Sequence, residues 1–303
     1  MVFIGSIGKG ILLINLCLGS GDRTIRRLRQ SCKMAIQSIN QEEIIGVNSI
    51  NTNSSELFVM GLAEESLRHR AVRHPYLKAL AEATLPDMAW SLRDFARHYY
   101  GYSAHFPRYL TTVISRLENP IHRKALLENL MEESGVYDDG EFAALAAQGI
   151  ERKWIDGIPH PLLFERFSDA LGVDLGLTAE HDQVVCWREL FLQILAFGSP
   201  AEAVGAFGLG TENIVRVIYE PLVTAIDHLQ GLSPRDTVFF PLHTTVDDHH
   251  QATLQAISTD FAHSQSGRLG LRRGMLKSLQ LRTAFWDWLY ERAINPDAAP
   301  EVI

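Results

Sequence analysis

Cysteine is scarce in this 303-residue chain, which has only Cys17, Cys32 and Cys186 and no CxxC pair. These isolated residues argue against a disulfide framework and a cysteine-ligated zinc site, and they favour the reducing cytoplasm. Long hydrophobic runs are missing as well, since the longest one near the start, residues 10–19, is too short to span a bilayer. This run lacks a clear basic region and a small-residue cleavage site, so we expect no signal peptide and no membrane partner.

An excess of positive charge is also absent. The chain carries 28 basic and 36 acidic residues, a net charge of −8, which argues against a nucleic-acid partner despite the local basic segment 268–273. No strand alternation, internal repeat or low-complexity block occurs. With 46% hydrophobic and 21% charged residues, the chain can bury a sizeable core.

The sequence divides into three parts. Residues 1–55 are compatible with a flexible extension, an additional helix, or residues upstream of the true start, and we assign them no function. Residues 56–295 have apolar residues at helical spacing almost without interruption, which predicts an all-α bundle. The last residues, 296–303, are expected to form a frayed tail.

Local signals refine the predicted helices. Aromatic residues recur at helical steps through residues 91–117, which predicts a buried stripe that Pro107 kinks or divides. Residues 119–135 have asparagine and proline at the start and glycine at the end, as helices often do. We predict one inserted helix over residues 141–155. Two further helices are predicted over 199–210 and 211–231, because each segment starts with serine or threonine followed by a carboxylate.

The most informative stretch is residues 239–254, where His243, Asp247 and His250 are spaced i, i+4 and i+7. On a helix these side chains fall within an arc of roughly 60°. Two imidazoles and a carboxylate on one helical face can form half of a site for a transition metal such as iron. The alternative is a solvated polar face that happens to contain histidines.

The remaining ligands must come from other helices, because bundles build metal sites from facing helices. Glu212 is one candidate, although a carboxylate at a helix start is also favoured by the helix dipole. His160 is another, although it could equally be an exposed first residue of a helix. Glu132 and Glu133 end a helix, which is an unfavourable place for carboxylates and indicates a cationic partner for at least one of them. The alternative is a pair of solvated carboxylates.

The ordered set of residues 129–135, residues 160–172, Glu212 and residues 243–250 resembles the haem-oxygenase-like di-iron oxidases. These are related in fold to thiaminase-like and pyrroloquinoline-quinone-synthase-like proteins. Residues 98–120 are also similar to a helix of the chlamydial death-domain-associated protein, an aminobenzoate-forming member. The resemblance covers roughly residues 56–295 and implies a haem-oxygenase-like seven-helix bundle.

Further implications of the resemblance concern the metal and the chemistry. Carried over by position, the family's ligands fall on six residues: Glu133, His160, Glu212, His243, Asp247 and His250. The resemblance implies two irons per chain, cycling between Fe(II) and Fe(III), with O2 as co-substrate. It also implies a small-molecule substrate, such as an amino acid, a fatty acid or a biosynthetic intermediate, and an external electron donor. Whether the chain forms a homodimer stays open.

Two departures from the family pattern matter. Residues 136–159 separate the first glutamate and histidine, which leaves the choice between Glu132 and Glu133 open and makes Glu151 a candidate for an additional carboxylate. Aminobenzoate-forming members have a lysine ten residues after the helix glutamate, where this chain has Leu222. Self-sacrificing aminobenzoate chemistry is therefore not expected.

Two other classes of function compete with an oxygen-dependent oxidoreductase. One is a metal-independent enzyme of the same fold, thiaminase-like or quinone-synthase-like, although no cysteine lies in the candidate cluster to serve as a nucleophile. The other is a non-enzymatic protein-binding module, which predicts an exposed apolar patch and no converging ligands.

Overall fold

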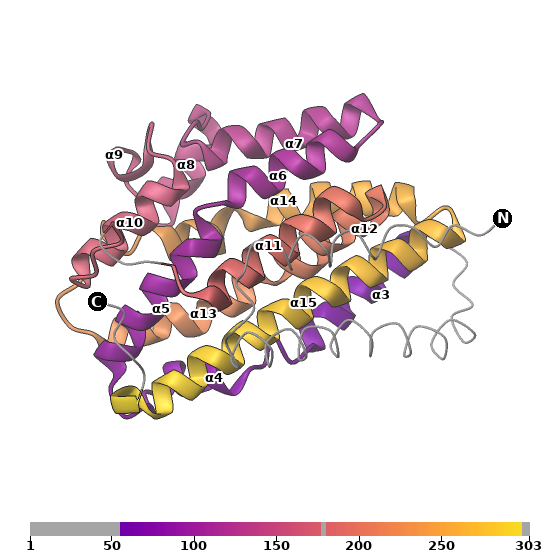
Figure 1. Cartoon of the computed structure of the whole chain (residues 1–303). Coiled ribbons are helices and arrows are strands. Elements are labelled where there is room, and N and C mark those ends of the chain that lie inside the picture. Colours follow the sequence, from indigo (N-terminus) through magenta and orange to yellow (C-terminus); the bar gives the residue numbers. More distant parts are fainter. Residues whose placement is uncertain (1–54, 177–179, 299–303) are drawn as a thin grey trace. The chain divides into compact units, whose positions relative to one another are not determined.

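The computed structural model describes residues 55–176 and 180–298, although not the side chains of residues 245–249. These residues form helices and no strand. In chain order the elements are α3 (Ser55–Arg68), α4 (Pro75–Ala81), α5 (Met88–Ser103), α6 (Phe106–Arg116), α7 (Pro120–Glu133), α8 (Asp139–Ala147), α9 (Arg152–Ile155), α10 (His160–Ala170), α11 (Asp182–Phe197), α12 (Pro200–Val204), the π-helix η2 (Gly205–Glu212), α13 (Asn213–His228), α14 (Phe239–Phe261), α15 (Gln265–Ile294) and the 3-10 turn η3 (Pro296–Ala298) (Figure 1).

The all-α prediction is thus confirmed for the described residues, and most of the predicted extension, residues 1–54, lies outside them. None of the described helices combines the length and apolar character that a bilayer crossing requires.

The predicted aromatic stripe lies on α5 and α6, which are two helices because Pro107 starts the first turn of α6. Phe95, Tyr99, Tyr102 and Tyr109 of the stripe are all buried. Ring stacking continues from this stripe into other helices: Tyr102 lies parallel to Trp187 of α11, with ring centroids 3.8 Å apart. The stripe therefore forms part of the core, as the sequence predicted.

The single inserted helix predicted over residues 141–155 is wrong. The segment instead forms α8 and α9, because Gly149 adopts a left-handed conformation with φ of +84°. The amide of Ile150 donates a hydrogen bond to the carbonyl of Leu145, five residues earlier. This is the 6→1 hydrogen bond of a Schellman motif, which ends helices. Glycine tolerates this conformation at no steric cost, so α8 stops here.

The two helices predicted over 199–210 and 211–231 are one continuous helical run, α12–η2–α13. Ser199 caps its start in a capping box with Glu202, as the sequence indicated. Thr211, however, does not cap anything: it lies inside η2, and its hydroxyl donates to the carbonyl of Ala206. The threonine–carboxylate pattern was therefore misleading in this segment, where glycines are accommodated within the helix.

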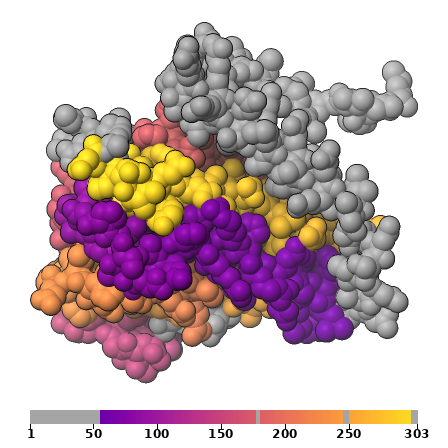
Figure 2. All heavy atoms as spheres, turned by 90° about the horizontal axis from the view of Figure 1, so that it is seen from below, coloured from indigo at the N-terminus to yellow at the C-terminus, as the bar shows by residue number. Residues whose placement is uncertain are grey.

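Helix α15 is the longest element and packs directly against α12, η2 and α11. The contact is close because glycines face it: a Cβ added to Gly205 would lie 2.0 Å from the Leu271 carbonyl oxygen, and one on Gly274 would lie 1.9 Å from that of Glu202. Figure 2 shows yellow α15 along one face, beside the indigo helices at the start of the described chain.

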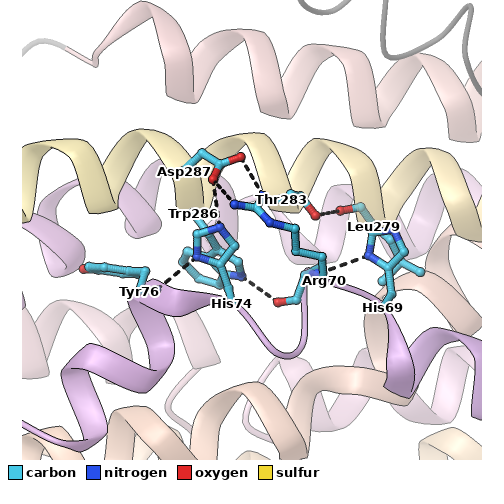
Figure 3. A network of polar contacts seen from close by, with 9 residues as sticks. His69, Arg70, His74, Tyr76, Leu279, Thr283, Trp286 and Asp287 are labelled. Atoms are coloured by element: carbon cyan, nitrogen blue, oxygen red, sulfur yellow. Dashed lines mark hydrogen bonds and ion pairs between the residues drawn. The ribbon is translucent and has the colours of Figure 1, made fainter.

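Polar contacts attach the segment between α3 and α4 to α15 (Figure 3). Arg70 donates to both carboxylate oxygens of Asp287, and the His74 ring lies 3.0 Å from the same carboxylate. The indole nitrogen of Trp286 donates to the carbonyl of Ala71 at 3.1 Å. These contacts hold the segment that precedes α4 against α15.

Candidate metal centre

Helix α7 ends in two buried carboxylates. Its start is the predicted one, since the Asn119 side chain accepts a hydrogen bond from the amide of Ile121 and Pro120 follows. Glu132 and Glu133 in the last turn are only 4% and 3% exposed. Because a helix C-terminus repels negative charge, two buried carboxylates there need cations or hydrogen-bond donors.

The segment after α7 returns to the helix end and brings α10 with it. Gly135 has φ of +82°, and a Cβ on it would lie 2.5 Å from the amide nitrogen of Ile158. Its carbonyl accepts a hydrogen bond from Gly157 at 2.9 Å. This close approach places His160, the first residue of α10, beside Glu133, so that Nδ1 and Oε2 are 3.0 Å apart.

Glu133, His160 and His243 form the centre of the site, with ligand atoms all within 4.8 Å of one another. His243 comes from α14, which packs against both α7 and α10. Its Nδ1 lies 2.7 Å from the Phe239 carbonyl, so Nδ1–H donates there and the lone pair is on Nε2. Burial and the neighbouring His160 lower the pKa of His243 to about 4, which keeps the ring in the neutral form that binds metals.

The Nδ1 atom of His160 is buried and makes no well-directed hydrogen bond with any side chain that the structure describes, although Glu133 is nearby. On the other side of the ring, Nε2 lies 2.7 Å from the Tyr137 hydroxyl. An imidazole nitrogen and a carboxylate oxygen that face each other in this way can share a cation. This orphaned donor atom is the feature of the structure that best fits a metal ion.

A second group adjoins the first. The Nε2 atom of His250 lies 3.0 Å from Oε2 of Glu132, and both residues are buried. Burial acts to lower the pKa of His250, but Glu132 and the nearby charges of Glu212 and Glu133 outweigh it and raise the pKa to about 9. Burial and the two neighbouring glutamates raise the pKa of Glu212 to about 7, against the opposing effect of His250. Three crowded carboxylates of this kind are typical of a site that holds extra positive charge.

Comparisons with known proteins agree with this geometry. A family model described as iron-containing redox enzyme matches residues 93–283, which is more than half of the chain. The chain belongs to this family. The match contains every residue of the two groups described above, from Glu132 to His250.

Known proteins resemble this chain in sequence and in structure. The chain is 24% identical to a 4-aminobenzoate synthase of Chlamydia muridarum over 196 residues, covering 62% of this chain and 74% of the relative. A CADD-like protein of unknown function from Nostoc punctiforme has a similar structure, with a TM-score of 0.61, 14% identity and coverage of 82% of this chain and 99% of that chain.

A TenA homologue from Pseudomonas syringae has a TM-score of 0.57 at 15% identity, with coverage of 77% of this chain and 91% of that chain. A structure from Shewanella denitrificans, described as having a haem oxygenase-like fold, has a TM-score of 0.60 at 16% identity and covers 84% of this chain and 99% of that chain. The haem-oxygenase-like fold expected from the sequence is thereby confirmed.

Five of the six residues predicted as metal ligands lie near one another in the structure. They are Glu133, His160, Glu212, His243 and His250. The sixth, Asp247, lies in α14, but its side chain is outside the part of the chain that is described. The sequence position of Glu212 suggested the start of a helix, but in the structure Glu212 ends the buried π-helix η2. π-Helices often occur at functional sites.

Glu132 and Glu133, between which the sequence left the choice open, each face a different histidine. The sequence indicated a cationic partner for at least one, and both have an imidazole partner. Glu151 is different: it precedes α9, is exposed, and forms an ion pair with Lys153. It does not lie with the buried carboxylates.

Two contributors were missed by sequence reasoning. Glu141 of α8 interacts through its side chain with Glu132, and burial together with this contact raises the pKa of Glu141. Its spacing from Asp138 is that of a capping box, which the structure forms, so a signal for its position existed. Tyr137, which contacts His160, had no such signal.

Proposed function

We propose that this iron-containing redox enzyme is an O2-dependent, non-haem di-iron oxidoreductase that oxidises a small organic metabolite. The proposal depends on one observation above all, the meeting of Glu133, His160 and His243 with donor atoms within 4.8 Å of one another. A mixed set of carboxylates and imidazoles suits iron. When bound, the iron would supply the redox chemistry with dioxygen that these side chains lack by themselves.

In this proposal the two groups of residues have separate tasks. Glu133, His160 and His243 would hold one iron, while Glu212 and His250 would hold the other together with Asp247. Tyr137 and the Phe239 carbonyl orient the rings of His160 and His243, because each contacts the second ring nitrogen. Glu132 orients the ring of His250 in the same way.

Protonation is part of how the side chains handle charge. With pKa values near 7 for Glu212 and near 9 for His250, the metal-free site holds protons at neutral pH. Metal binding requires the deprotonated forms, so loading the site releases these protons. The burial of Glu132, Glu133 and Glu212 keeps bulk water away from the site.

The aminobenzoate chemistry named for the chlamydial relative is not part of the proposal. Leu222, fully buried on α13, stands where the aminobenzoate-forming members are expected to have a lysine. An external substrate and an external electron donor are proposed instead.

The two competing classes of function have less support. A protein-binding module predicts no converging ligands, yet three ligand residues from three helices converge here. A metal-independent enzyme would need an acid, base or nucleophile of its own, and Cys186 is a half-buried residue of α11 outside the cluster. Membership of an iron-containing family also favours the metal-dependent enzyme.

The test is an iron count on purified protein. Fe(II) is added without oxygen to the wild type, His160→Ala and Asp247→Ala, with His228→Ala as a control because His228 is exposed. After removal of unbound metal, we expect about two irons per chain in the wild type and the control, and fewer in the other variants. Rapid mixing with oxygen should then give a transient visible absorption in the wild type and in His228→Ala, and not in His160→Ala or Asp247→Ala.

Other outcomes would reject the proposal or its details. If the wild type binds no iron above background, the oxidoreductase proposal fails and a metal-independent enzyme becomes the leading account. If one iron binds and His160→Ala leaves it unaffected, the ligand set is wrong.

A further inference from the structure

Arg282 of α15 is a positive charge in the middle of the bundle, with only 1% of the residue exposed. Its Nη1 lies 3.3 Å from the Tyr99 hydroxyl and its Nη2 lies 3.5 Å from the Tyr102 hydroxyl. Its Nε is buried and has no hydrogen-bond partner in the described part of the chain. No carboxylate of the described residues pairs with it, although an unpaired charge in a protein interior is costly.

Arg292, ten residues later on the same helix, shows how this chain buries an arginine that is purely structural. Its guanidinium donates to both oxygens of Asp94 at 2.9 and 2.7 Å, the two-pronged geometry that arginine and carboxylate favour. The hydrogen bonds of Arg282 within the described residues are two long contacts to neutral hydroxyls, and its guanidinium also lies over the rings of Tyr102, Trp187 and Trp286. Its donor groups are therefore left ready for an anion that the chain itself does not provide.

The groups around Arg282 suit an anion. Tyr99 and Tyr219 bring their hydroxyls to 3.0 Å from each other, and the rings of Tyr102 and Trp187 lie 5.3 Å from the guanidinium carbon. Burial raises the pKa of Tyr102, so its hydroxyl stays protonated and can donate. We call Arg282, Tyr99, Tyr102 and Tyr219 the Arg282 cluster.

The Arg282 cluster adjoins the candidate metal centre. The ring of Tyr219 lies 5.7 Å from the ring of His243. Tyr102 is close enough to Glu212 for the glutamate charge to contribute to its raised pKa. A molecule that is held by Arg282 through one end can therefore have its other end near His243 and Glu212.

We propose that the Arg282 cluster binds the carboxylate group of the substrate, so that the substrate is a small carboxylic acid. This inference rests on the proposed function, since it supplies the substrate class of the same site. The guanidinium donates to the carboxylate oxygens, the hydroxyls of Tyr99 and Tyr102 add hydrogen bonds, and the aromatic rings enclose the adjoining carbon atoms. Arg282 is thus a binding and positioning residue.

The test uses metal-free protein, so that it does not depend on iron or on turnover. Benzoate and octanoate are titrated against the wild type while tryptophan fluorescence is followed, because Trp187 stacks on Tyr102 beside Arg282. The neutral amides, benzamide and octanamide, are the matched ligands. We expect at least one acid to bind about tenfold to a hundredfold more tightly than its amide.

Variants separate binding from folding. Arg282→Met should remove the preference for the acid, Arg282→Lys should keep part of it, and Arg235→Met, at an exposed arginine, should leave it unchanged. Thermal unfolding of each variant reports whether it is folded. Equal affinity of acids and amides for the wild type, no saturable binding of either acid, or an undiminished preference in folded Arg282→Met would overturn the inference.

Iron counts on the same proteins keep the two proposals apart. Arg282→Met should bind as much iron as the wild type. If the wild type binds no iron, the proposed metal centre is rejected. If the wild type binds iron but shows no preference for acids over amides, only the proposed role of the Arg282 cluster is rejected.

Discussion

Oε2 of Glu133 lies 3.0 Å from Nδ1 of His160, although the two residues belong to different helices joined by the long segment 134–159. The contact depends on the left-handed Gly135 and on the return of Ile158 to the end of α7. Replacing Glu133 by glutamine should leave the shape intact and remove one negative oxygen. We expect the iron content to fall by at least half, measured by metal analysis after anaerobic loading.

The control for this prediction is Glu128→Gln on the same helix, where the carboxylate forms an exposed ion pair with Lys124. Its iron content should equal that of the wild type. Full iron content in Glu133→Gln would mean that Glu133 does not hold the metal.

Tyr137→Phe removes the hydroxyl that contacts Nε2 of His160 and keeps the ring. Partners of this kind orient metal-binding histidines, and their loss typically weakens metal affinity by about 10- to 100-fold. Iron titration with a competing chelator measures the change. Phe142→Leu, which alters the ring packed against Tyr137 without touching His160, should change the affinity much less.

The stability of the metal-free protein should fall as pH rises from 6.5 to 9. In the folded state the pKa of His250 is raised from 6.5 to about 9, so its stabilising contribution is complete below pH 6.5 and is lost as pH passes through 9. A shift of this size corresponds to stability on the order of 3 kcal/mol. Urea unfolding at a series of pH values measures it, and His250→Gln should flatten this part of the profile.

At lower pH two opposite effects meet. The raised pKa of Glu212 stabilises the folded state at low pH, and this contribution is lost as pH rises from 4.5 to 7. The lowered pKa of His243 acts in the opposite direction and destabilises the folded state as pH falls from 6.5 to 4. Glu212→Gln should therefore expose the His243 effect as a clear loss of stability in acid. A profile identical to that of the wild type would contradict the raised pKa of Glu212.

Gly205→Ala should be strongly destabilising, because the added Cβ would lie 2.0 Å from the carbonyl oxygen of Leu271. Overpacking against backbone costs about 3 kcal/mol. Gly61→Ala is the matched control: it is also within a helix, and no atom lies within 4 Å of the added Cβ. There we expect stabilisation of about 0.5–1 kcal/mol from helix propensity, measured by urea unfolding of both variants.

Arg292→Met should cost about 3–5 kcal/mol of stability, because it leaves the buried carboxylate of Asp94 without its cation. Arg70→Met removes a partner of Asp287 in an exposed pair, and it should cost less than about 1 kcal/mol. The difference between the two melting temperatures tests the distinction. Equal losses would show that burial does not decide the energy of these pairs.

Much of the site could be predicted from the sequence. The spacing of His243 and His250 on one helix face was visible, as were the cap at Asn119 and the glycine that ends α7. The unfavourable position of Glu132 and Glu133 indicated a basic partner for at least one of them, and a histidine lies beside each. These features depend on local periodicity and on the chemistry of helix ends, which single sequences carry.

Other features depend on contacts between distant segments. The glycines of η2 look like a helix end in the sequence, but close packing on α15 keeps the helical run intact through Thr211. Likewise, Gly149 divides the predicted inserted helix because it adopts a left-handed conformation. Arg282 lies among apolar residues of α15, and nothing in their spacing indicates that it lacks a carboxylate partner among the described residues.

The glycine contacts between η2 and α15 have a consequence for how the protein can adjust to a ligand. Glu212 ends η2, Arg282 belongs to α15, and the backbones of these two elements touch without side chains between them. Side chains can change rotamer to absorb a small shift, but a backbone contact cannot. Glu212 and Arg282 therefore belong to one rigid unit. Under the two proposals above, we expect this fixed separation to make the protein discriminate between carboxylic acids of different length.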